Sequence, residues 1–70
     1  MSGPVRVVVN GEPRETRPEA TVLALLESLG CAPGRVAVEL NGDALRRADF
    51  AGRTLRDGDR IEVVQFVGGG

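Results

Sequence analysis

The sequence predicts an α+β domain in which one mixed β-sheet wraps around a single helix. Three segments, 5–9, 35–40 and 60–66, are rich in β-branched residues and have the two-residue period of a strand. Segment 22–29 instead has its apolar residues at helical spacing. Asn-Gly pairs follow the first two strand segments, and this dipeptide is the strongest short signal for a hairpin turn.

The first hairpin is predicted over residues 5–16. Its first strand, 5–9, places Val8 on one face and the other valines on the opposite face. Asn10-Gly11 can supply the positive φ angles of a type I′ turn. Residues 13–16 would form the returning strand, and because its proline lacks an amide donor we expect this strand at a sheet edge.

The predicted helix begins after Thr21, a favoured N-cap residue, and runs for about nine residues. Gly30 stands where a left-handed residue commonly ends a helix, and Pro33 prevents the helix from resuming. So short a helix is marginal alone and must be held by packing against a sheet. Its apolar stripe consists of Val22, Leu25, Leu26 and Leu29.

The second half of the chain predicts another hairpin, an irregular connection that anchors Phe50 in the core, a tight turn and a final strand. In order, these are strands 35–40 and 44–46 around Asn41-Gly42, connection 48–52, turn Asp57-Gly58-Asp59 and strand 60–66.

A single helix covers only one face of a sheet, so the simplest arrangement is a mixed sheet of four to five strands around that helix. This arrangement is the β-grasp. We expect one such domain at residues 1–67, with a loose leader at 1–4, followed by a flexible glycine tail at 68–70. The helix stripe would pack against Val5, Val7, Val36, Val38, Ile61 and Val63.

The composition argues against several classes of function. The net charge is −1, the nine basic and ten acidic residues are dispersed, and Trp and Tyr are absent, which disfavours nucleic-acid binding. Histidine is absent and Cys31 is the single cysteine, so no catalytic triad, Cys–His pair or cysteine metal cluster can form. We therefore expect a chain that is not an enzyme and binds no metal or cofactor.

Two chemically capable features have simpler structural interpretations. Asp57 and Asp59 could bind a cation, but their tight turn accounts for both. Cys31 could be a sulfur-handling nucleophile, yet it follows the negative end of the predicted helix, which disfavours a thiolate. We favour a passive loop or core thiol. The longest apolar stretch is too short to span a bilayer and no signal peptide is visible, so we expect no membrane association and a cytoplasmic location.

The final glycines, Gly68, Gly69 and Gly70, are the strongest functional candidate. They would present an α-carboxylate on an arm without Cβ atoms, which can adopt backbone angles closed to other residues. Three extended residues reach roughly 10 Å, enough to enter another protein's active site. A phosphate-binding glycine loop opens a helix, whereas this run opens none. The alternative is a frayed end without function.

A candidate docking face lies beside the tail. By strand alternation, Val8, Val64 and Phe66 point away from the helix, and Val67 follows at the root of the tail. If this face is in solvent, its apolar cluster is typical of a partner surface. The alternative is that these strands are simply rich in β-branched residues.

Several short motifs together cover nearly all of the chain. They are Asn10-Gly11-Glu12, Ala20-Thr21-Val22, Leu25-Leu26, residues 35–42 (RVAVELNG), Leu55, residues 57–64 (DGDRIEVV) and the terminal glycines. Through these residues the chain resembles the ThiS sulfur carriers of thiamine biosynthesis. The terminal Gly-Gly after a β-grasp is specific to protein-activation carriers, and the leader 1–4 is the main departure from the family.

The resemblance implies a ubiquitin-like fold and a cycle of sulfur transfer. A ThiF-like activating enzyme would use Mg-ATP to adenylate the Gly70 carboxylate. Sulfur from cysteine, supplied through a desulfurase, would then displace AMP and leave a thiocarboxylate. A ThiG-like thiazole synthase would take that sulfur for the thiazole ring. This chain would supply a carboxyl group and a recognition face, and the partners would supply the catalysis.

Three other functions remain open at this point. A molybdopterin-type or cysteine-forming carrier would use the same tail chemistry with a different sulfur acceptor. A ubiquitin-like modifier would join the tail to lysines of other proteins. A plain interaction module would have an incidental tail.

Overall fold

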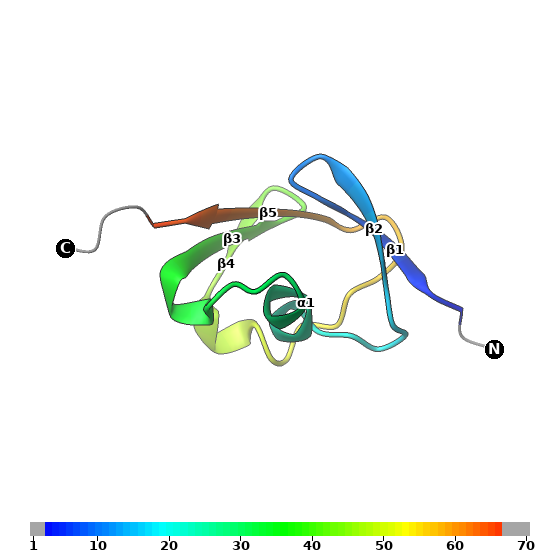
Figure 1. Cartoon of the computed structure of the whole chain (residues 1–70), viewed down its shortest axis with the longest axis horizontal. Coiled ribbons are helices and arrows are strands. Elements are labelled where there is room, and N and C mark those ends of the chain that lie inside the picture. Colours follow the sequence, from blue (N-terminus) through cyan, green and yellow to red (C-terminus); the bar gives the residue numbers. More distant parts are fainter. Residues whose placement is uncertain (1–2, 67–70) are drawn as a thin grey trace.

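A computed structural model describes residues 3–66 and confirms the predicted β-grasp. Five strands form one mixed sheet in the order β2-β1-β5-β3-β4, with α1 packed against one face (Figure 1). β1 and β5 pair in parallel, and the other neighbours are antiparallel. The elements are β1 (Val5–Val9), β2 (Glu12–Thr16), α1 (Val22–Ser28), the 3₁₀ turn η1 (Pro33–Arg35), β3 (Val36–Leu40), β4 (Asp43–Leu45), the 3₁₀ turn η2 (Arg47–Asp49) and β5 (Arg60–Gln65).

Residues 1–2 and 67–70 lie outside the described part of the chain. The predicted domain boundary at 67, the tail at 68–70 and half of the predicted leader therefore fall there. Within residues 3–66, the single α-helix is too short to cross a membrane.

Both Asn-Gly pairs form the predicted turns. The φ angles are +50° and +83° at Asn10 and Gly11, and +53° and +89° at Asn41 and Gly42, as a type I′ turn requires. The prediction of strand 44–46 was one residue late, because the two-residue turn pairs Leu40 directly with the residue after Gly42. β2 is an edge strand, as its proline indicated.

The helix is capped at both ends by the predicted residues. Thr21 Oγ1 accepts a hydrogen bond from the Ala24 amide at 3.1 Å. Gly30 has a φ of +75°, and the Gly30 and Cys31 amides bond the carbonyls of the last turn in a Schellman motif. The helix is seven residues long, shorter than the predicted nine, because this motif turns the chain away at once.

The core lies between α1 and the inner face of the sheet. Val5, Leu29 and Val63 were predicted as core members but are only partly buried. Val5 begins β1, Leu29 is the C-cap of α1, and Val63 lines an open groove at the edge of the core. Phe50 is 2% exposed, as predicted, and Leu55 is equally buried although the periodicity gave no sign of it. The buried residues are Val7, Val9, Val22, Leu25, Leu26, Val36, Val38, Leu40, Phe50, Leu55 and Ile61.

Candidate functional site

The end of β5 is the root of the predicted tail. This strand lies between β1 and β3 (Figure 1), and it pairs with β3 at every position from Ile61 to Gln65. The pairing continues one residue further, because the Phe66 amide donates to the Arg35 carbonyl at 2.9 Å. The sheet therefore fixes the chain up to the last described residue. Gly68, Gly69 and Gly70, the predicted tail and modification site, lie outside the described residues.

The side chain of Asn10 holds β5 where its pairing with β1 stops. Asn10 Oδ1 accepts from the Val63 amide at 2.8 Å, and Asn10 Nδ2 donates to the Val63 carbonyl at 3.2 Å. On the other side of β5, Asn41 Oδ1 accepts from the Arg60 amide at 2.9 Å. Each Asn-Gly turn therefore also positions the central strand. This second role was not predicted, since a turn signal says nothing about distant partners.

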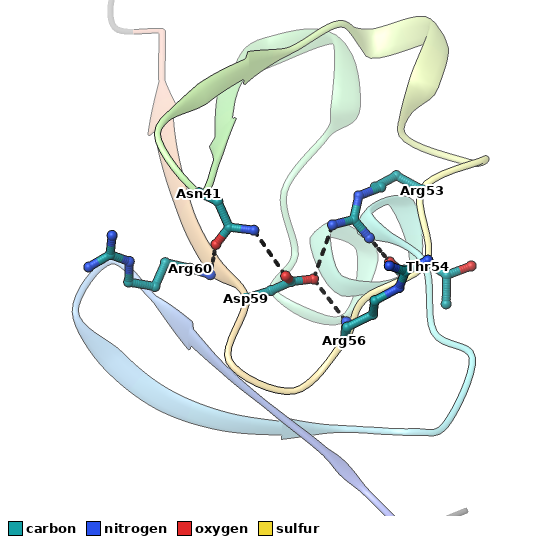
Figure 2. Close-up of polar contacts among 6 residues, drawn as sticks. All are labelled: Asn41, Arg53, Thr54, Arg56, Asp59 and Arg60. Atoms are coloured by element: carbon teal, nitrogen blue, oxygen red, sulfur yellow. Dashed lines mark hydrogen bonds and ion pairs between the residues drawn. The ribbon is translucent and has the colours of Figure 1, made fainter.

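Asp59 organises the turn from which β5 begins (Figure 2). The residue is 6% exposed. Its Oδ1 accepts from Asn41 Nδ2 at 3.0 Å, and its Oδ2 accepts from the Arg56 amide at 2.8 Å. Oδ2 also lies 3.5 Å from the Arg53 guanidinium, which in turn donates to the carbonyl of the following threonine. This buried carboxylate is thus paired and hydrogen-bonded, as burial of a charge requires.

The cation-binding interpretation of Asp57 and Asp59 finds no support. The Asp59 oxygens already face donors, and Asp57 Oδ1 accepts from the Arg6 amide at 2.8 Å. Among residues 3–66, no three His, Cys, Asp or Glu side chains gather as a metal site would need. Both aspartates make hydrogen bonds that hold the turn before β5.

The outer face of the sheet, away from α1, carries part of the predicted docking cluster. Val64 and Phe66 are each 62% exposed. Ala37, which is also exposed, lies directly opposite Val64 on β3. We call Ala37, Val64 and Phe66 the apolar patch. Alternation along 35–40 already placed Ala37 on this face, but its contact with Val64 required the strand register.

Val8 does not join the apolar patch. It is half-buried and lies opposite Arg60, four residues along β5 from Val64. At ~3.3 Å per residue, that separation is about 13 Å. The prediction that Val8 clusters with the residues near the tail is therefore wrong. Strand alternation predicts the face on which Val8 lies, but it does not predict the register between β1 and β5. In that register, Val8 pairs with the first residue of β5, far from the residues next to the tail. Val67, the fourth predicted docking residue, lies outside the described residues.

Cys31 is half-buried and packs against the core. Gln65 Nε2 lies 3.6 Å from its sulfur atom. The two residues line an open groove of about 390 Å³ between the end of α1, the first hairpin and β5. Cys31 is therefore a loop thiol at the edge of the core, and its passive role stays a prediction.

β5 thus brings the chain to Phe66 in a fixed position beside the exposed apolar patch. Within residues 3–66, the buried Asp59 carboxylate is committed to structural contacts, so its role here is to hold the start of β5.

Comparisons with known proteins place this chain in a family. The model of the ThiS family matches residues 7–70. The sulfur carrier protein ThiS of Thermus thermophilus is 42% identical over 64 residues, which cover 91% of this chain and 98% of that protein. The crystal structure of a thiamine biosynthesis protein, ThiS, from Geobacter metallireducens has a TM-score of 0.79 and 39% identity, covering 94% of this chain and 100% of that chain.

Some curated relatives are much longer. The thiazole synthases of Paramagnetospirillum magneticum and Magnetococcus marinus are each 41% identical over 66 residues, which cover 94% of this chain but 20% of those proteins. The chain thus spans about a fifth of their length. The fold, the match of residues 7–70 and the near-complete coverage of the Thermus relative agree, and we conclude that this chain belongs to the ThiS family.

Proposed function

We propose that this chain is a sulfur carrier of thiamine biosynthesis that works through the carboxylate of Gly70. The observation that carries the proposal is the 42% identity to a protein named as a sulfur carrier, of which this chain covers 98%. The family match also extends to Gly70 and so includes the glycines on which the chemistry depends. The proposal requires that Gly70 carries a free carboxylate in the cell.

The proposed chemistry converts a poor electrophile into a reactive one. A partner enzyme joins the Gly70 carboxylate to AMP, with Mg-ATP as the source and pyrophosphate as the other product. A desulfurase transfers sulfur from cysteine as a persulfide, whose terminal sulfur attacks the acyl carbon, and AMP leaves. A thiol reductant then cleaves the resulting acyl disulfide and is itself oxidised to a disulfide, which releases the thiocarboxylate. ATP and magnesium belong to the activating partner, and no side chain of this chain is required as acid or base.

The folded part of the chain positions the Gly70 carboxylate for reaction. The sheet holds the chain up to Phe66, and the four residues from there to Gly70 span at most about 14 Å when extended. Docking of the apolar patch would bring the carboxylate within that reach of a partner's active site. Holding the reacting groups together in this way lowers the entropic cost of the reaction.

Thiazole synthase is the proposed sulfur acceptor. Two relatives that bear this name contain a segment 41% identical to this chain within a single longer polypeptide. Joining of two functions in one chain raises their effective concentration for each other, which is useful when one must hand a group to the other. This fusion favours a thiazole acceptor over a molybdopterin or cysteine acceptor.

Intact-mass spectrometry tests the proposal. The purified chain is incubated with an activating enzyme of the ThiF kind, Mg-ATP, cysteine, a desulfurase and a thiol reductant. We expect the mass increase of one oxygen-to-sulfur exchange at Gly70, and its reversal when thiazole synthase and its other substrates are added. A variant with one residue appended after Gly70 is the control and should gain no sulfur. A wild-type chain that stays unmodified would refute the carrier function.

A further inference from the structure

Two acidic residues face each other on the outer surface of the sheet. Glu39 of β3 and Glu62 of β5 are direct cross-strand partners, and both are exposed. Side chains in such a pair have Cβ atoms about 5 Å apart, and like charges at this position are destabilising. We call these residues the acidic pair.

Neither member of the acidic pair belongs to an ion pair in the described part of the chain. Within residues 3–66 the ion pairs are Arg6–Glu15, Arg46–Asp49 and Arg53–Asp59, so neither member of the acidic pair takes part in one. Arg60 shares this face two residues before Glu62 but forms no ion pair with it in the described part of the chain. By contrast, Arg6 and Glu15 neutralise each other further across the same face.

The acidic pair adjoins the apolar patch. Ala37 and Val64 form the next outward-facing cross-strand pair toward the tail, at a distance of about 7 Å along the strands. Phe66 follows on the same side, with its amide bonded to the Arg35 carbonyl. An exposed apolar cluster and two adjacent glutamates outside any ion pair of the described residues thus form one continuous surface beside the root of the predicted tail.

We propose that this surface docks the activating enzyme through an apolar pocket that receives Phe66 and through one or more arginine or lysine side chains that face Glu39 and Glu62. The inference rests on the proposed function, and it adds the chemistry of the partner surface. Cations from the partner would relieve the repulsion within the acidic pair. The attraction would therefore be stronger than for a single isolated glutamate, and it would orient the carrier with its tail toward the active site.

Charge complementarity decides between this occupant and a second copy of the chain. In a symmetric dimer built on this face, the acidic pairs of both copies would lie in the same interface and repel each other. A partner with basic residues is attracted by the same feature. The apolar patch provides contact area, and the acidic pair makes that contact selective.

Binding to the purified activating enzyme tests the inference, with affinity measured at low and at high salt. Glu39→Gln, Glu62→Gln and the double variant remove charge with little change in shape. Glu27→Gln, on the exposed side of α1, is the control that removes the same charge elsewhere. We expect the double variant to bind about fivefold more weakly at low salt. The difference should shrink at high salt, where exposed charges are screened, and Glu27→Gln should bind like the wild type.

Two readouts separate this inference from the proposed function. Thermal unfolding should show the double variant to be at least as stable as the wild type, because removal of like charges relieves repulsion. Acquisition of sulfur by the wild-type chain tests the carrier function independently of Glu39 and Glu62. If the wild type acquires sulfur and the double variant binds the enzyme with unchanged or higher affinity, the docking inference is overturned and the carrier function stands.

Discussion

Asp59 illustrates how burial gives a turn residue a second role. In the sequence it belongs to an Asp-Gly-Asp turn and needs no further explanation. In the fold it is buried and links the second hairpin, through Asn41, to the loop that carries Arg53 and Arg56. Loss of one partner of a buried charge is costly, because the remaining groups stay desolvated without a counterpart.

We predict that Asp59→Ala lowers the free energy of unfolding by about 2–4 kcal/mol. The substitution leaves Asn41 Nδ2 and the Arg56 amide without their acceptor. Asp59→Asn keeps the shape and one acceptor oxygen, and it should cost less. Urea denaturation measures both values. Asp43→Ala, an exposed change on β4, is the control and should stay within about 0.5 kcal/mol of the wild type. Equal stability of Asp59→Ala and Asp43→Ala would contradict this account.

Phe66 differs from Asp59, because its large apolar side chain is exposed rather than buried. Because it is 62% exposed, we predict that Phe66→Ala changes the free energy of unfolding by no more than about 0.5 kcal/mol. The same change should weaken binding to the activating enzyme at least about tenfold, since exposed aromatic residues commonly dominate protein interfaces. Thermal unfolding and calorimetric titration measure the two effects. A large fall in melting temperature would place Phe66 in the core instead.

At the scale of elements, β5 is the strand on which the site depends. β1 supports it only at Arg60 and Ile61, and the side chain of Asn10 takes over at Val63. Asn10 therefore has two roles: its positive φ forms the turn, and its side-chain amide hydrogen-bonds the neighbouring strand. These bonds hold the middle of β5, just beyond its pairing with β1.

We predict that Asn10→Gly lowers the free energy of unfolding by about 1–2 kcal/mol and speeds hydrogen exchange at the Val63 amide. Glycine accepts the φ of +50°, so the turn survives while both side-chain bonds to Val63 are lost. Asn10→Asp retains the acceptor for the Val63 amide and should give an intermediate effect. Exchange measured by NMR decides the matter, and a Val63 amide as protected as in the wild type would show that β5 does not need this contact.

At the scale of the whole molecule, the folded body and the predicted reactive end are separate parts of the chain. All eleven core residues identified in the described part lie between Val7 and Ile61. Substitutions in the tail should therefore change sulfur transfer without changing the free energy of unfolding.

We predict that Gly69→Val abolishes sulfur acquisition, because a branched side chain next to Gly70 crowds a narrow partner cleft. The free energy of unfolding should stay within about 0.5 kcal/mol of the wild type. Gly3→Val is a matched control, because a Cβ atom there meets open space, and it should acquire sulfur normally. Intact-mass spectrometry and urea denaturation provide the two measurements. Normal adenylation of Gly69→Val would show that the cleft tolerates side chains.

Much of this architecture followed from local patterns. Strand periodicity, the spacing of Val22, Leu25 and Leu26, and the two Asn-Gly pairs predicted the order of the elements and most of the core. These features act over a few residues, so a single sequence contains them. Element ends shifted by one or two residues because turns and caps set them. Leu55 was not predicted as a core residue because it lies outside any periodic segment.

The sequence by itself determined the fold class, the two hairpin turns, the helix caps and the exposed faces of Val64 and Phe66, since each depends on the properties of residues close together in the chain. Tertiary structure alone decided that Asp59 is buried, that Asn10 bonds Val63 across 53 residues, that Val8 lies apart from the patch and that Glu39 meets Glu62. The physical reason is register. Strand pairing selects which distant residues become neighbours, and that choice depends on how the whole sheet packs around its helix.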